Sequence, residues 1–181
     1  MSEKSMGKDL WRLAPWLGAA VGLSAILAVG AMPACHSEAP DFTAPLVSGP
    51  DVGDRVSLTA LRGEIVVIDF WASWCGPCRR SIPVLNRLAA DYDGRVHVYG
   101  INVEAMEPMA VGSAHQRLGA TFPSLHDPSG SIQRAYAVTA LPTLFVIDRE
   151  GQIWHTERGI PALDDLSQVL DELLSANTQA R

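Results

Sequence analysis

Two cysteines separated by two residues, Cys75 and Cys78, are the feature of this sequence best suited to chemistry. A strand-like run ends just before them and a helical pattern follows, which predicts a thiol at a helix N-terminus. Free backbone N–H groups and the helix dipole stabilise a thiolate there. We therefore expect Cys75 to be the more exposed, more acidic thiol and the attacking nucleophile. Cys78, one turn further in, would be the buried resolving thiol.

This pair predicts thiol–disulfide exchange. The Cys75 thiolate would attack a substrate disulfide, and Cys78 would then attack the Cys75 sulfur and release the reduced substrate. A C-x-x-C pair can also form half of a structural zinc site, but the sequence lacks two further ligands at suitable spacing. The sequence thus predicts no metal and no cofactor beyond the Cys75–Cys78 disulfide itself.

A carboxylate near the pair could accept the proton that Cys78 must lose before it attacks. Asp69 ends the apolar run six residues before Cys75, and burial there would raise its pKa enough for it to act as a base. The alternative is an exposed aspartate at a strand end, or a hydrogen-bond acceptor that faces the helix. Glu104 and Glu107 lie further along the chain and could approach the site, without an assigned role.

The elements that must position these residues follow from hydrophobic patterning. The β-branched run at 64–70 predicts a strand covered on both faces, and the helical spacing after Cys78 continues to Tyr92. Strands and helices alternate further on, which predicts an α/β fold with a mixed central sheet and helices on both faces. The remaining predicted segments are a β-hairpin within 45–62, strands at 95–103, 144–148 and 152–156, and helices at 107–118, 131–137 and 164–175.

The segment FWASWCGPC, Phe70 to Cys78, resembles the active-site motif of the thioredoxin superfamily, and Gly-Pro is the pair found in its reducing members. Over roughly residues 41–175 the chain resembles the TlpA/ResA-type family of membrane-tethered thiol–disulfide oxidoreductases. This wider resemblance is carried by VSL at 56–58, LRG at 61–63, FPSLHDPSG at 122–130, AYAV at 135–138 and LPTLFVID at 141–148. It implies a thioredoxin-like fold with an N-terminal β-hairpin and a strand–helix insert near residues 95–119.

The resemblance also implies site residues. A cis peptide bond before Pro142 would face the cysteines and offer the backbone of Ala140 and Leu141 to an extended substrate. Trp74 would shield the disulfide and give substrates an apolar platform. Many relatives of this type have a glutamate where this chain has Ser81, so the proton-handling role passes to Asp69, which matches the buried aspartate of thioredoxins. The expected substrate-binding residues are Trp74, Gly76, Pro77, Ala140, Leu141 and Pro142.

The N-terminal segment predicts where the domain works. Residues 13–34 carry no charged side chain, are long enough to span a bilayer, and follow basic residues that favour an inside N-terminus. They form an uncleaved anchor, a lipoprotein-type signal that leaves Cys35 lipidated, or a plain secretion signal. We expect a cell-membrane protein whose domain faces the periplasm or extracytoplasmic space. The predicted division is 1–35 anchor or signal, 36–44 linker and 45–181 thioredoxin-like domain.

The charge composition limits the kinds of molecule that the chain is expected to bind. The 181 residues hold 14 Lys and Arg against 20 Asp and Glu, a net charge of −6 that argues against nucleic acid. We expect protein thiol or disulfide substrates, an upstream membrane electron donor and a monomer. The leading hypothesis is an extracytoplasmic reductase of protein disulfides, with cytochrome c maturation as one setting. The alternatives are a peroxide-reducing redoxin, a disulfide oxidase, and a binding module that uses the Pro142 region without turnover.

Overall fold

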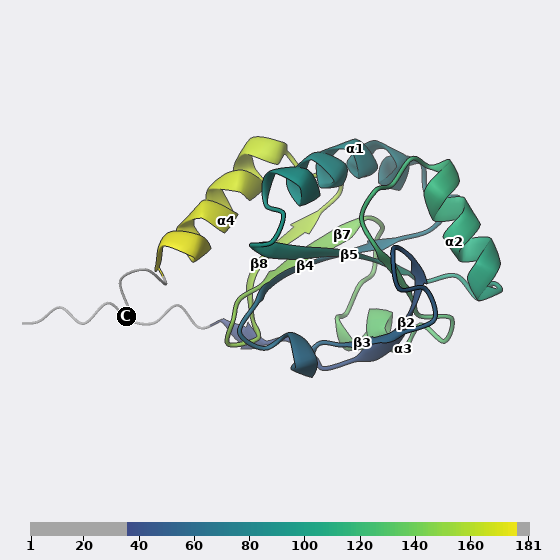
Figure 1. The fold of residues 1–181 in the computed structure, drawn as a ribbon, viewed down its shortest axis with the longest axis horizontal. Helices are drawn as coiled ribbons and strands as arrows, with labels where there is room; N and C mark the ends of the chain where they lie inside the picture. Colours follow the sequence, from purple (N-terminus) through teal and green to yellow (C-terminus); the bar gives the residue numbers. More distant parts are fainter. Residues whose placement is uncertain (1–35, 177–181) are drawn as a thin grey trace, which may run out of the picture. The chain divides into compact units, whose positions relative to one another are not determined.

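A mixed sheet of eight strands, with helices on both faces, organises residues 36–176, the part of the chain that the computed structural model describes (Figure 1). The strand order is β1-β8-β7-β4-β5-β6-β2-β3. The central strand β4 (Ile65–Trp71) runs parallel to β5 (Val96–Asn102) and antiparallel to β7 (Thr143–Ile147). The other strands are β1 (Ser37–Glu38), β2 (Thr43–Ser48), β3 (Arg55–Ser57), β6 (Ser124–His126) and β8 (Gln152–Arg158). The helices are η1 (Thr59–Leu61), α1 (Gly76–Asp91), α2 (Pro108–Arg117), α3 (Ser131–Ala135) and α4 (Leu163–Ala176).

β4 separates two hydrophobic cores. All seven of its residues are buried, as its continuous apolar, β-branched sequence predicts. Because side chains alternate along a strand, Val67 packs with α1 and α4 on one face, while Phe70 packs with aromatic residues on the other. Phe70 meets Phe145 edge to face, with ring centroids 5.9 Å apart. The thioredoxin-like fold predicted from the sequence is therefore confirmed.

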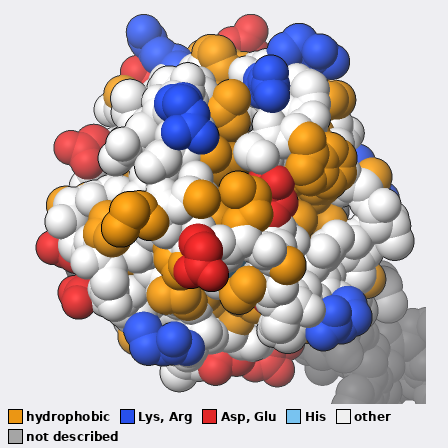
Figure 2. Space-filling model, turned by 90° about the vertical axis from the view of Figure 1, so that its right-hand side faces the viewer, with side chains coloured by type: hydrophobic (Ala, Val, Ile, Leu, Met, Phe, Trp, Pro, Cys, Tyr) orange, Lys and Arg blue, Asp and Glu red, His pale blue; other side chains and the backbone are white. Residues whose placement is uncertain are grey.

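The predicted N-terminal hairpin consists of β2 and β3, which pair antiparallel, and β2 also pairs with β6. Helix α2 lies close against β2, where Gly112 has no side chain to separate it from the carbonyl of Val47. On the outer side of these elements Val52 and Met109 are exposed. Figure 2 shows apolar side chains spread over the middle of this face, with most of the charged ones toward its rim. The hairpin thus forms one end of the sheet, and β6 separates it from β5, the strand of the strand–helix insert.

Two short segments differ from the sequence prediction. Residues 36–44 are not a free linker, because β1 pairs with β8 and Phe42 is buried in the core. The folded domain therefore begins before residue 45. The sequence pattern also missed β6, a buried strand of three residues that pairs with β5 and β2.

The predicted anchor or signal at residues 1–35, including Cys35 as a lipidation site, lies outside the described residues. Among the helices within residues 36–176, none is long and apolar enough to cross a membrane.

Candidate active site

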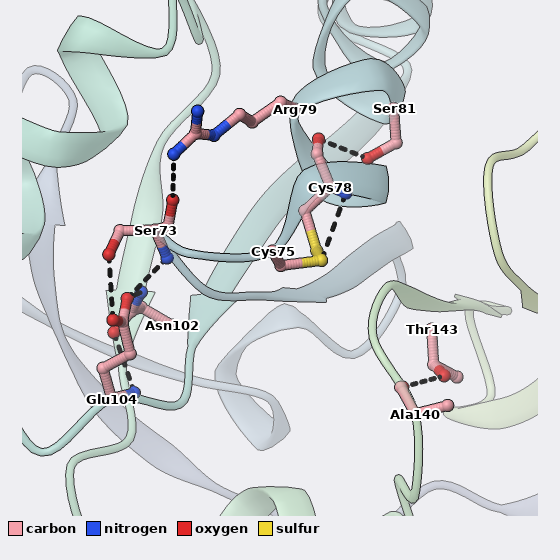
Figure 3. The surroundings of a disulfide bond; sticks show 9 residues. All are labelled: Ser73, Cys75, Cys78, Arg79, Ser81, Asn102, Glu104, Ala140 and Thr143. Carbon is pink, nitrogen blue, oxygen red and sulfur yellow. Dashed lines mark hydrogen bonds between the residues drawn. A yellow bond between two sulfur atoms is a disulfide. The ribbon is translucent and has the colours of Figure 1, made fainter.

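Cys75 and Cys78 lie where the loop after β4 enters α1, and they are joined by a disulfide with a Cα–Cα distance of 5.3 Å. Cys75 is the N-cap residue of α1, and its Sγ accepts a hydrogen bond from the backbone N–H of Cys78 at 3.2 Å (Figure 3). Pro77 fits the first turn, where no intrahelical N–H donor is needed. The sulfur of Cys75 thus occupies the position at which helix N-termini stabilise anions.

The order of exposure of the two cysteines follows the expectation, although both are buried in the disulfide form. In the disulfide form Cys75 is 3% exposed and Cys78 is fully buried, so neither presents an open thiol surface. The neighbouring Trp74 is 69% exposed. The apolar surface beside the disulfide therefore comes from Trp74 rather than from the cysteines themselves.

Asp69 is buried in β4, on the face that α1 covers. It shares this face with Val67, two positions before it, which packs in one cluster with Leu85 of α1. Trp71, two positions after it, lies on the same face and packs in one cluster with Cys78. Burial raises the pKa of Asp69 well above its usual value, and its Oδ1 has no hydrogen-bond partner among the described residues. A carboxyl group whose neutral form is favoured by burial thus lies on the face of the sheet that α1 covers.

Ser81 is fully buried in α1, as Cys78 is, and it supplies a hydroxyl where many relatives of this type have a glutamate. Its hydroxyl donates a hydrogen bond to the carbonyl oxygen of Cys78 at 2.9 Å. Asp69 is therefore the buried carboxyl group in the part of the sheet that the start of α1 covers.

A surface groove runs past the disulfide, between the start of α1 and the loop before β7. The bond between Leu141 and Pro142 is cis, and the hydroxyl of Thr143 donates to the carbonyl oxygen of Ala140 at 2.7 Å. This loop faces the cysteines across the groove in Figure 3. The groove is lined by Trp74, Cys75, Gly76, Pro77, Val103, Gln133, Thr139, Ala140 and Leu141. It brings together Trp74, Gly76 and Pro77 from one segment with Ala140 and Leu141 from another, five of the six predicted substrate-binding residues, and its lining carries no charge.

Within residues 36–176, no group of three or more His, Cys, Asp or Glu side chains is placed to hold an ion. The groups that the site presents include two sulfur atoms, the buried carboxyl group of Asp69 and the backbone dipoles at the start of α1.

One polar group at the site received no role from the sequence. The Glu104 carboxylate accepts hydrogen bonds from the Ser73 N–H at 2.6 Å and from its hydroxyl at 2.9 Å. Partial burial works against ionisation of Glu104, but hydrogen bonds from Asn102 and Ser73 outweigh it and lower the pKa. The sequence did hold a signal for this role: Asn102 ends β5 and Glu104 comes two residues later, and parallel strands end at the same edge of a sheet.

Comparisons with known proteins agree with this geometry. The AhpC/TSA family matches residues 35–156. The chain is 34% identical over 142 residues to the thiol-disulfide oxidoreductase ResA of Geobacillus thermodenitrificans, covering 77% of this chain and 78% of the relative. It is 36% identical over 138 residues to a thiol:disulfide interchange protein DsbE homologue of Paracoccus denitrificans, covering 74% of each.

Solved structures show the same fold. A candidate thiol:disulfide interchange protein DsbE from Chlorobium tepidum superposes with a TM-score of 0.68 at 35% identity, covering 77% of this chain and 96% of that one. The exposed lipoprotein thioredoxin of Streptococcus pneumoniae superposes with a TM-score of 0.65 at 29% identity, covering 74% of this chain and 100% of that one.

Proposed function

The chain belongs to the AhpC/TSA family and is a thiol–disulfide oxidoreductase, and from this premise we propose that it reduces disulfides of protein substrates outside the cytoplasmic membrane. The observation that carries the proposal is the Cys75–Cys78 disulfide at the N-terminus of α1, which faces the loop at Pro142 across an uncharged groove. Such a groove accepts an extended chain, whereas a buried pocket would select a small molecule.

In the proposed reaction the reduced enzyme starts as a dithiol. The Cys75 thiolate attacks one sulfur of the substrate disulfide, and the other substrate sulfur leaves as a thiolate. Cys78 then loses its proton and attacks the Cys75 sulfur of the mixed disulfide, which releases the second substrate thiol. The enzyme ends as the Cys75–Cys78 disulfide, and the substrate has gained two electrons.

Asp69 is proposed as the base for the second step. Burial holds its pKa high, so the carboxylate can take the Cys78 proton and return it when the disulfide is reduced again. Substrate contacts are proposed for Trp74 and for the backbone of Ala140 and Leu141.

The proposed cellular location rests on the N-terminal segment and on the similar proteins. An anchor at residues 13–34, or a lipid on Cys35, would hold the monomeric domain at the outer surface of the membrane, where a membrane electron donor recharges it. Similarity to an exposed lipoprotein thioredoxin and to ResA and DsbE proteins supports this placement. One proposed substrate is apocytochrome c, whose haem-binding cysteines must be reduced before haem attachment.

Two alternative activities compete with this proposal. A peroxide-reducing redoxin needs a peroxidatic cysteine in another loop position, and the chain's cysteines are Cys35, Cys75 and Cys78 alone. A disulfide oxidase would use the same pair in the opposite direction. Only the redox potential separates it from a reductase.

The reduction potential of the Cys75–Cys78 pair tests the proposed direction. The full chain is equilibrated in redox buffers of known poise, and the free thiols are labelled and counted. The Cys78→Ser variant, which cannot form the disulfide, gives the background. A reductase predicts a value near the ~−270 mV of thioredoxin, whereas a value near the ~−120 mV of a strong oxidant would reject the proposal.

A further inference from the structure

We propose that Glu104 is a positioning residue for the exchange reaction, which holds the two walls of the substrate groove in a fixed relation to each other. The inference rests on the proposed function, because a groove of defined width matters only if a protein chain binds there. Glu104 itself touches neither sulfur atom in the hydrogen bonds observed. It acts through the loop before Cys75 on one side and through α3 on the other.

The first wall is the loop that carries Trp74 and Cys75. Both oxygens of the Glu104 carboxylate accept hydrogen bonds from Ser73, one from its backbone N–H and one from its hydroxyl. On the opposite side of the same residue, the Arg79 guanidinium donates to the Ser73 carbonyl oxygen at 3.0 Å (Figure 3). The peptide two residues before Cys75 is thus held from both directions.

Glu104 is itself fixed by the end of β5. The Asn102 amide donates to the Glu104 carboxylate at 3.0 Å, and the Glu104 N–H donates back to the Asn102 side-chain oxygen at 3.0 Å. Asn102 is fully buried. This reciprocal pair sets the direction in which the carboxylate points, so it cannot follow Ser73 if the loop moves.

The second wall connects to Glu104 through two buried residues, His126 at the end of β6 and Asp127 directly after it. The His126 Nε2–H donates to the Glu104 carbonyl oxygen at 2.9 Å, and the Asp127 N–H donates to the Asn102 carbonyl oxygen at 2.8 Å. The Asp127 carboxylate then accepts the N–H of Gln133 at 2.9 Å, at the start of α3. His126 and Asp127 are each 2% exposed, so water does not compete for these bonds.

Gln133 completes the connection to the groove. Its carbonyl accepts the Val138 N–H at 3.0 Å, and its side-chain amide donates to the Val138 carbonyl oxygen at 3.3 Å. Val138 leads directly into the groove-lining residues 139–141, and Gln133 lines the groove itself. An unbroken chain of hydrogen bonds therefore runs from Ser73 on one wall to the Pro142 loop on the other.

Removal of the Glu104 carboxylate would leave the Ser73 N–H and hydroxyl without their acceptor. The loop with Trp74 would then sample several positions relative to residues 139–141. An extended protein substrate needs both walls at once, whereas a small disulfide needs only an accessible sulfur. The effect should therefore fall on the KM for a protein substrate.

The test compares Glu104→Ala and Glu104→Gln with the unchanged full chain. Turnover is measured with insulin as the protein disulfide and with dithiobis(nitrobenzoic acid) as the small disulfide. Glu104→Gln keeps one acceptor oxygen for Ser73 and should fold even if the alanine variant does not. The matched control is Glu107→Gln, because Glu107 is exposed and its side chain makes no capping hydrogen bond at the start of α2.

For Glu104→Ala we expect the insulin KM to rise by roughly 10-fold, with kcat for the small disulfide nearly unchanged. The glutamine variant should recover part of the loss, and Glu107→Gln should match the unchanged chain. Equal KM values in all four proteins would overturn the inference, as would a parallel loss with both substrates. If the unchanged chain itself fails to reduce insulin, the proposed function fails instead.

Discussion

The proposed reaction requires the carboxyl group of Asp69 to ionise, whereas the stability of the fold favours its neutral form. As a base it must be able to ionise, yet it lies buried with Oδ1 unpartnered among the described residues. Because burial raises its folded-state pKa above the unfolded value, folding favours the protonated form. The contribution of Asp69 to stability is therefore fully present below the unfolded pKa and is lost as the pH rises through the folded pKa.

Asp69→Asn should remove this pH-dependent cost. At pH 8 we expect the variant to be more stable than the unchanged protein by about 1–3 kcal/mol, because burial disfavours the ionised carboxylate and the neutral amide has no charge to desolvate. Near pH 4 the gain should vanish. The measurement is urea denaturation of the oxidised proteins at both pH values, with the exposed Asp93→Asn as the control. A gain of the same size at both pH values would contradict the account, since it would not depend on ionisation.

At the residue scale, the sequence predicts which side chains form the site better than it predicts the contacts that those side chains make. Cys75, Cys78 and Asp69 stand within ten positions of one another, so their spacing along β4 and α1 is local information. The roles of Glu104 and His126 depend on hydrogen-bond partners 31 and 22 positions away, which only the folded sheet brings together. That both cysteines are almost completely buried in the disulfide form depends on the tertiary structure, and their spacing alone does not predict it.

Among the elements, α2 depends on an unusually close contact with β2. A Cβ atom built on Gly112 would overlap the carbonyl oxygen of Val47. Since Val47 and Val111 belong to the same buried cluster as Cys75 and Cys78, a shift of α2 would reach the packing under the active site.

Gly112→Ala should therefore destabilise the protein even though alanine favours helices. Forcing α2 away from β2 should cost about 1–3 kcal/mol, the usual price of overpacking, which exceeds the gain in helix propensity. Urea midpoints measure the effect, with Gln116→Ala, an exposed position on α2, as the control. An unchanged or higher midpoint for Gly112→Ala would show that α2 can move without loss.

The elements that the sequence failed to predict are the shortest ones. β1 has two residues and β6 has three, too few for an alternating pattern to be read. Their formation depends on partners, because β1 extends the edge at β8 and β6 fills the position between β5 and β2. Longer elements such as β4, α1 and α4 carry their own periodicity and were predicted to within a few residues.

At the scale of the whole molecule, the reaction site is the meeting point of two segments far apart in sequence. The loop after β4 supplies the cysteines, and the loop before β7 supplies Ala140, Leu141 and Pro142. The antiparallel pairing of β4 with β7 brings them to the same end of the sheet. The fold therefore assembles a groove in which a substrate disulfide can meet Cys75 while its backbone lies along the second loop.

The most direct test of the account is to trap the reaction half way. Cys78→Ser full-length protein, reduced and mixed with an excess of a disulfide-containing protein, should accumulate a mixed disulfide through Cys75, visible on a non-reducing gel and by mass spectrometry. The unchanged protein should release its substrate, and Cys75→Ser should trap nothing. A mixed disulfide formed through Cys78 in the Cys75→Ser variant, or full turnover by Cys78→Ser, would contradict the assignment of attacking and resolving thiols.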